Sequence, residues 1–345
     1  MEEIKELVEM SNEIGRFKDL VQAGGGNTSV KTKDGKIIIK ASGFTFSGMN
    51  ETSGFSILNQ NKISDFFEKH TEAADPKENE NMYNRALADS MFDLNLPKPS
   101  MEAGMHIFLH RVVMHTHPVM ANIINCVKGG EKIARELFSD ITPEFLWLEY
   151  KNPGYSLAKE IKNKVYSYKS KNGVKPEVIF LKNHGIIISR DNSADCVKMT
   201  IEVNEKIYNY LKNNFGLERF IDPQVQIENG IYFNNSETVK QFVSNLNDNK
   251  HFLSKFLIPD DAVYCSNVSI QDINNLDKSS ITFVDNTGIF YPWNEKKSAK
   301  VNEMLTAKLY MLSALSKIGE VDFLKDEDVN YILSMESEKY RQKLN

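Results

Sequence analysis

Two histidines one residue apart, His115 and His117, lie inside the apolar segment VVMHTHPVMANII, residues 112–124. Residues i and i+2 of a β-strand point to the same face of the sheet. The spacing therefore predicts two imidazoles side by side, with Thr116 turned away, and such a pair can reach one divalent cation. Two polar rings that are simply buried in a strand would show the same spacing, so further ligands are needed to distinguish the two interpretations.

A third histidine, His184, lies in the KNHG turn of the segment PEVIFLKNHGIIIS, residues 176–189. The two β-rich runs around this turn predict a hairpin. Tight turns at strand ends commonly carry functional groups, so this ring could approach His115 and His117 from another direction. A metal site with three imidazole ligands is the hypothesis that follows.

A carboxylate, Glu102, stands upstream in the segment KPSMEAGMH. It falls in the first turn of a predicted helix, where the helix dipole favours a negative charge. It also has the chemistry of a general acid/base beside a metal, and its position alone leaves both interpretations open. Of the remaining histidines, His106 and His110 are predicted to be packing or surface residues, and His70 and His251 receive no role.

The glycine-rich segment AGGGNTSVK, residues 23–31, is a candidate anion-binding loop. Glycines allow the chain to turn so that several backbone N–H groups face an anion. Side chains that could add donors or charge follow: Asn27, Thr28, Ser29, Lys31 and Lys40. The spacing matches neither the phosphate loop of nucleotide hydrolases nor the dinucleotide fingerprint. Ser42 and Gly43 form a second candidate, and ordinary turns remain the alternative for both.

The elements that must position these residues alternate without a regular βαβ order. Helices are predicted at residues 1–20, 101–110 and 193–211, and strands at 36–40, 111–116 and on both sides of the KNHG turn. Residues 70–83 are predicted to be a surface excursion. After residue 222 the sequence shows strand-like runs at 255–266 and 280–291, a helix at 297–318 and a final acidic helix. The pattern favours an α/β (α+β) protein with a mixed or antiparallel sheet flanked by helices, divided into residues 1–222 and a smaller α/β unit at 223–345.

The composition narrows the classes of function. With 345 residues and a net charge of −5, the chain lacks the basic excess that general binding to nucleic acid or anionic membranes requires. Three widely spaced cysteines form no disulfide framework, which favours a reducing compartment. The acidic N-terminal helix is unlike a signal peptide, and no apolar run is long enough to span a membrane. A cytoplasmic enzyme or binding protein is expected.

Taken in chain order, the motifs resemble the class II aldolase/adducin family. The resemblance rests on the Gly-Asn-Thr-Ser loop, a Ser-Gly turn, Pro-Ser-x-Glu, His-x-His-Pro and Asn-His-Gly, and it covers roughly residues 5–215. It implies a three-layer α-β-α fold around a central, mostly antiparallel or mixed sheet. The tail, residues 225–345, is similar to the segment that follows the aldolase domain in long rhamnulose-1-phosphate aldolase/dehydrogenase fusion proteins. The chain ends at Asn345 and is expected to be the aldolase part without the dehydrogenase domain.

The resemblance also implies roles for particular residues. His115, His117 and His184 would hold Zn²⁺ or another divalent metal, and Glu102 would be the catalytic acid/base. The residues implied to bind the substrate phosphate are Gly26, Asn27, Thr28, Ser42, Gly43 and Ser100. The sequence departs from many fuculose-phosphate-type members at Met101, where they have a second serine, and either Lys31 or Lys40 could replace that donor. A proton donor from a neighbouring subunit is also implied, for which Glu149 and Tyr150 are the nearest candidates.

The implied activity is that of a class II aldolase, an aldehyde-lyase that cleaves or forms a C–C bond of a small phosphorylated ketose through a metal-bound enediolate. The resemblance further implies a homo-oligomer, and a tetramer is the expected oligomeric state. Sugar-phosphate epimerases, decarboxylases and dehydratases share the same ligands, so they remain alternatives. An adducin-like binding module without catalysis is the non-enzymatic alternative, and the three histidines together with Glu102 argue against it.

Overall fold

The computed structural model describes residues 2–141, 144–228, 231–245, 251, 253–266, 268–270, 280–284 and 288–335. Its larger sheet has seven strands in the order β3-β2-β1-β4-β7-β6-β5. These strands are β1 Asn27–Lys31, β2 Lys36–Lys40, β3 Phe55–Asn59, β4 Val112–Thr116, β5 Leu146–Leu148, β6 Val178–Leu181 and β7 Gly185–Arg190. Neighbouring strands are antiparallel except β5 and β6, which are parallel. The expected mixed, mostly antiparallel sheet is confirmed.

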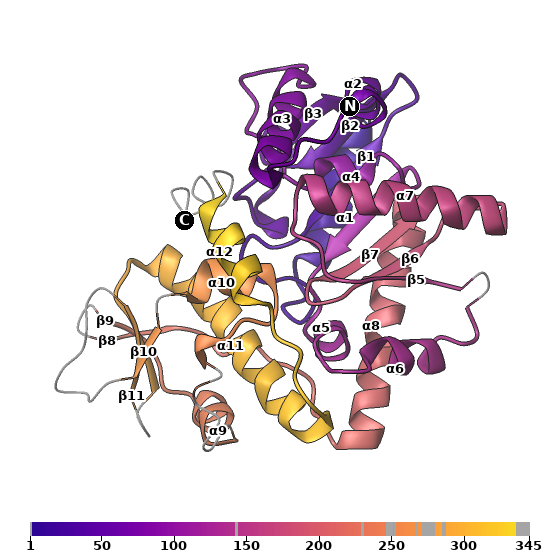
Figure 1. Cartoon of the computed structure of the whole chain (residues 1–345). Helices are drawn as coiled ribbons and strands as arrows, with labels where there is room; N and C mark the ends of the chain where they lie inside the picture. The colour runs from indigo at the N-terminus through magenta and orange to yellow at the C-terminus, as the bar shows by residue number, and fades with distance from the viewer. Residues whose placement is uncertain are drawn as a thin grey trace.

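Helices cover both faces of this sheet (Figure 1). They are α1 Glu2–Ile14, the 3₁₀ turn η1 Phe46–Gly48, α2 Gln60–Lys69, α3 Pro76–Asp89, α4 Ala103–His106, α5 Val119–Asn125, α6 Gly130–Leu137, α7 Tyr155–Asn172 and α8 Ser193–Phe215. The side chains of each strand alternate between the faces: Ile38 of β2 packs in the core that contains α1 and α8, whereas Ile37 and Ile39 pack with α2 and α3. The three-layer α-β-α arrangement is confirmed.

The C-terminal extension, residues 223–345, contains a second sheet and further helices. Its elements are β8 Gln226–Glu228, β9 Ile231–Asn234, α9 Glu237–Asn245, α10 Pro259–Cys265, β10 Val268–Ile270, β11 Ile281–Val284, β12 Gly288–Tyr291, α11 Glu295–Ile318 and α12 Asp326–Ser334. The five strands lie in the order β10-β11-β12-β9-β8. In Figure 1 the extension, in orange and yellow, lies beside the larger sheet, and α11 packs against both α10 and α5.

One hydrophobic core joins the extension to the rest of the chain. Met114 of β4 and Ile124 of α5 belong to the same buried cluster as Leu305 and Leu309 of α11. The two parts of the chain share this core, and the division into domains at residues 1–222 and 223–345 stays a prediction. Among the described residues, no helix combines the length with the apolar character that crossing a membrane demands.

Two segments differ from the sequence-based expectation. Residues 70–83 were expected to be irregular, but α3 begins at Pro76, with the Asp75 side chain accepting a hydrogen bond from the Lys77 N–H. An aspartate cap followed by proline is a standard helix start, and the polar composition of the segment obscured it. Residues 255–266 were expected to be strand-like, but Pro259–Cys265 is the helix α10.

The elements nearest to the candidate site residues follow the sequence more closely. The predicted strand at 111–116 is β4, the hairpin around KNHG is β6 and β7, and the predicted helix at 193–211 is α8. The helix expected at 101–110 is shorter, because only Ala103–His106 is helical. The last acidic helix is α12, and residues 336–345 lie outside the described residues.

Candidate active site

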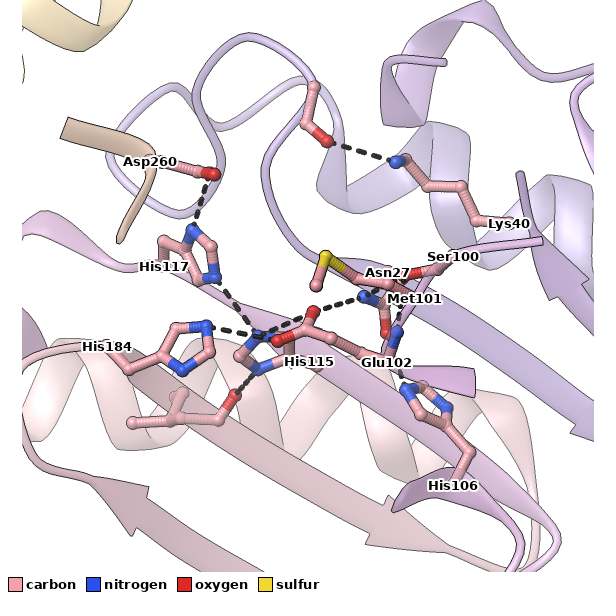
Figure 2. A network of polar contacts seen from close by, with 12 residues as sticks. Asn27, Lys40, Ser100, Met101, Glu102, His106, His115, His117, His184 and Asp260 are labelled. Carbon is pink, nitrogen blue, oxygen red and sulfur yellow. Dashed lines mark hydrogen bonds and ion pairs between the residues drawn. The ribbon is translucent and has the colours of Figure 1, made fainter. Parts of the chain in front are cut away.

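Three imidazoles meet at one end of the larger sheet (Figure 2). His115 is in β4, His117 follows that strand directly, and His184 lies in the β6–β7 turn. The strand β4 pairs with β7, and Asn183 takes a left-handed φ of 52°, which makes the turn tight enough to bring His184 over the pair. All three rings are buried, and each offers a nitrogen within 4.8 Å of the others. The structure thus brings the three rings together, as their positions in the sequence suggest.

The hydrogen bonds of two of these rings fit a cation between them. His115 Nδ1–H donates to the Ile186 carbonyl oxygen at 2.9 Å, and His117 Nδ1–H donates to Asp260 Oδ2 at 2.9 Å. In neutral rings both Nε2 atoms then carry lone pairs, and these atoms face each other at 3.0 Å. Burial lowers the pKa of His115 to about 3, although the charge of Glu102 opposes this, so a shared proton is disfavoured at neutral pH. A metal ion is the better partner for both lone pairs.

Glu102 lies against the same rings. Its Oε2 is 3.5 Å from His115 Nε2, and its Oε1 is 3.2 Å from His184 Nε2. Burial would raise the pKa of this carboxyl, but the positive charge that the His115 and His184 rings carry when protonated outweighs burial and holds the pKa below its ordinary value. Within the described part of the chain, Oε1 has no well-formed hydrogen bond. Glu102 is therefore an ionised carboxylate with one oxygen open to a proton or a ligand.

A buried chain of hydrogen bonds holds the other oxygen of Glu102. Asn27 Nδ2 donates to Glu102 Oε2 at 2.8 Å, so the Asn27 amide oxygen is left to accept from His106 Nε2–H. His106 Nδ1 then accepts from the Ser29 hydroxyl at 2.8 Å. Burial lowers the pKa of His106 to about 3, so the ring is neutral. His106 was expected to be a packing or surface residue, and the i, i+2 spacing of Asn27 and Ser29 on one strand face was the signal that could have indicated its partners.

The candidate phosphate residues lie around a narrow pocket that contains Glu102 and His117. Among its lining residues are Gly24, Gly26, Asn27, Lys40, Ser42, Gly43, Ser100 and Met101. Gly26 has φ +67°, and a Cβ there would lie 2.5 Å from the His115 carbonyl oxygen, so only glycine fits. The Thr28 side chain lies outside this pocket, since alternation along β1 turns its hydroxyl toward Ser11 Oγ at 2.6 Å.

The two lysines named as replacements for a missing serine occupy different places. Lys31 Nζ donates to the carbonyl oxygens of Leu109 and His110 at 2.6 Å each, away from the pocket. Lys40 lines the pocket and donates to the Gly24 carbonyl oxygen at 3.2 Å. Of the two, Lys40 is the cation near Ser100 and Met101.

The two candidates for a proton donor from a neighbouring subunit lie outside this pocket. Glu149 accepts from Lys182 Nζ at 3.1 Å, and the Tyr150 hydroxyl lies 3.1 Å from Asn152 Oδ1. Burial raises the pKa of Tyr150 well above its ordinary value. Their role across a subunit interface stays a prediction.

Comparison with known proteins identifies the family. The model of the Class II Aldolase and Adducin N-terminal domain matches residues 5–211. A curated relative, an uncharacterized oxidoreductase YuxG of Bacillus subtilis (strain 168), is 30% identical over 219 residues, which are 61% of this chain and 30% of that protein. The chain thus spans less than a third of that relative's length.

A solved structure agrees with this assignment. The N-terminal class II aldolase domain of a conserved protein from Thermoplasma acidophilum superposes with a TM-score of 0.50 and 27% identity, covering 60% of this chain and 93% of that one. The family match extends over more than half of the chain and includes the glycine loop, Glu102 and all three clustered histidines. The chain therefore belongs to the class II aldolase and adducin family.

Proposed function

We propose that this protein is a metal-dependent aldolase that cleaves or forms a C–C bond of a small phosphorylated ketose. The observation that carries the proposal is that the ionised, buried Glu102 contacts the rings of both His115 and His184. A buried carboxylate with one open oxygen beside three imidazoles is suited to moving a proton next to a cation. The three buried, free cysteines support a cytoplasmic location.

The proposed metal is Zn²⁺, held by the ring nitrogens of His115, His117 and His184. The ion would act as a Lewis acid toward the oxygens of the substrate. Glu102 would transfer the proton that accompanies cleavage, since Asn27 fixes Oε2 while Oε1 accepts no well-formed hydrogen bond from the described residues. The hydrogen bonds from His115 and His117 to acceptors behind them keep the metal-facing nitrogens unprotonated.

The proposed phosphate site lies at the glycine-rich side of the pocket. Gly26 and Gly43 would offer backbone N–H groups, with Thr28 adding at most its own backbone N–H. Ser42 and Ser100 would offer hydroxyl donors. The Asn27 Nδ2 donates to Glu102 Oε2 at 2.8 Å and to Ser100 Oγ at 3.1 Å, so Asn27 would bind the phosphate through its side chain only by releasing one of these acceptors. Many members of the family resembled have a second serine, a neutral donor, at the position of Met101. Lys40 would replace that donor and would also bring a positive charge. The family resemblance also leads us to propose a homotetramer.

Metal analysis combined with a substrate screen tests the proposal. Purified protein is expected to hold about one divalent metal per chain, and with rhamnulose, fuculose or ribulose phosphates it should release dihydroxyacetone phosphate and an aldehyde, detected by NMR. The His115→Ala variant should lose both the metal and the release. A metal-loaded protein that converts these sugars only into isomers or dehydrated products would rule out the aldolase. A protein that binds no metal would favour a binding module instead.

A further inference from the structure

The extension contributes a carboxylate to the candidate metal site. Pro259 and Asp260, at the start of α10, line the pocket that contains Glu102 and His117. In Figure 2, Asp260 lies on a separate segment of the ribbon, on the side of His117 opposite to His115. Asp260 is 2% exposed, and the family match ends well before it, at residue 211. The pocket is therefore built from both parts of the chain.

The contact between Asp260 and His117 determines which ring nitrogen carries the proton. Asp260 Oδ2 lies 2.9 Å from His117 Nδ1, and a carboxylate at this position accepts the Nδ1 proton. The lone pair is then on Nε2, which is 3.0 Å from His115 Nε2. A carboxylate acceptor fixes the orientation of an imidazole and increases its basicity as a ligand. The equivalent acceptor behind His115 is the neutral backbone carbonyl of Ile186.

The glycine loop is shaped around this contact. A Cβ on Gly25 would lie 2.1 Å from Asp260 Oδ2 and 3.0 Å from His117 Nδ1. A side chain there would displace either the carboxylate or the ring. The middle glycine of the triple-glycine run thus has a role separate from that of Gly26, since it leaves room for the extension to reach the histidine.

The neighbouring aspartate, Asp261, contacts other groups and does not face the pocket. Its Oδ2 accepts from the Leu257 N–H at 2.8 Å, and its Oδ1 lies 3.2 Å from Lys308 Nζ of α11, with both side chains fully buried. Asp261 thus attaches α10 to the core of the extension, whereas Asp260 faces the pocket. The two adjacent aspartates are similarly buried but have different partners.

We propose that Asp260 is a positioning residue of the metal centre, and that the extension completes this centre by orienting His117 toward a divalent cation. This inference rests on the proposed metal binding by His115, His117 and His184. It concerns a residue outside the matched family domain, and it gives the extension a function in the site.

The test measures cation affinity in the full chain. Metal-free wild type, Asp260→Asn and Asp260→Ala are titrated with Zn²⁺ in competition with a chelator, and Co²⁺ spectra report the ligand geometry. Asp260→Asn should bind Zn²⁺ about 10–100-fold more weakly than the wild type, as expected when an outer partner of a ligand is lost, and Asp260→Ala more weakly still. The matched control is Asp261→Asn, which should lower the thermal unfolding temperature but leave the Zn²⁺ affinity of the folded protein unchanged.

A second measurement needs no variant. Long-range ¹H–¹⁵N correlation on the metal-free wild type should show His117 protonated at Nδ1, and a His117 protonated at Nε2 would overturn the inference even if Asp260→Ala does not fold. Wild-type affinity in both Asp260 variants would also overturn it while leaving the metal centre intact. Absence of Zn²⁺ binding by the wild type would instead remove the proposed function, and this inference with it.

Discussion

Two buried glutamates, Glu102 and Glu80, have similar burial and opposite electrostatics. Their exposed fractions are 7% and 6%, so burial does not distinguish them. The pKa of Glu102 lies below its ordinary value, whereas burial raises the pKa of Glu80 to about 7. One carboxyl is held ionised and the other accepts a proton near neutral pH.

The difference comes from the groups that face each carboxyl. Glu80 Oε2 accepts from the Tyr155 N–H at 2.9 Å and Oε1 accepts from Asn84 Nδ2 at 3.3 Å, so neutral donors surround it. Gly154, with φ +94°, lets the backbone approach Glu80 where a Cβ would lie 2.5 Å from Oε1. Glu102 instead faces imidazoles that can carry charge or bind a cation. Burial supplies the desolvation in both places, and the neighbours decide whether the result is an anchor for α7 or a reactive group.

The largest expected effect is that of Glu102→Gln on catalysis. The amide keeps the size of the side chain but cannot take up the proton, so the turnover number should fall by about 10²–10⁴-fold, the usual contribution of a general acid/base. Metal content should stay at the wild-type level, because His115, His117 and His184 remain. Turnover is measured by NMR with the sugar phosphate that the wild type cleaves, and metal by elemental analysis.

The matched control is Glu80→Gln, which makes the same chemical change at the same degree of burial. Its turnover should remain near that of the wild type. A Glu102→Gln protein with full activity would remove Glu102 as the acid/base. An equal loss of turnover in both variants would show that the loss comes from a less stable fold rather than from the missing proton transfer.

The second-largest expected effect is that of Glu80 on the pH dependence of the free energy of unfolding. The pKa of Glu80 is raised from 4.5 to about 7, so the folded protein binds this proton more tightly than the unfolded chain does. The linked stabilisation is complete below about pH 4.5 and is lost as the pH rises through 7. Relative to Glu80→Gln, the wild type should therefore lose up to about 3 kcal/mol of unfolding free energy between pH 5 and pH 8. Urea unfolding of both proteins at several pH values measures this difference, and parallel profiles would contradict it.

The local part of the site could be predicted from the sequence. The His115–His117 pair follows from the two-residue period of a strand, and the hairpin signal around KNHG places His184 at a strand end. That β4 lies next to β7 rather than β6 is a property of the whole sheet. The spacing therefore left the convergence of the three rings as a hypothesis, and the family resemblance made it a definite expectation. The structure supplies the distances.

The long-range part could not be predicted. Asp260 meets His117 across 143 positions of sequence, and its segment was expected to be strand-like because apolar and β-branched residues surround Pro259. Packing of α10 against α11 overrides that local preference. His106 was missed for a related reason: the spacing of Asn27 and Ser29 places both on one face of β1, but only the tertiary structure brings that face to α4.

The smallest expected effect is that of His106→Phe, which tests the hydrogen-bond chain behind Glu102. The phenyl ring keeps much of the volume but leaves the Asn27 amide oxygen and the Ser29 hydroxyl without this partner, which should cost about 1–3 kcal/mol of unfolding free energy. Turnover should fall less than in Glu102→Gln, because the carboxylate stays and only the orientation of its donor is lost. Ser29→Ala, which removes only the far end of the chain, should have the weaker effect on both quantities. Wild-type turnover in His106→Phe would show that Asn27 holds Glu102 without help, and that His106 only fills space.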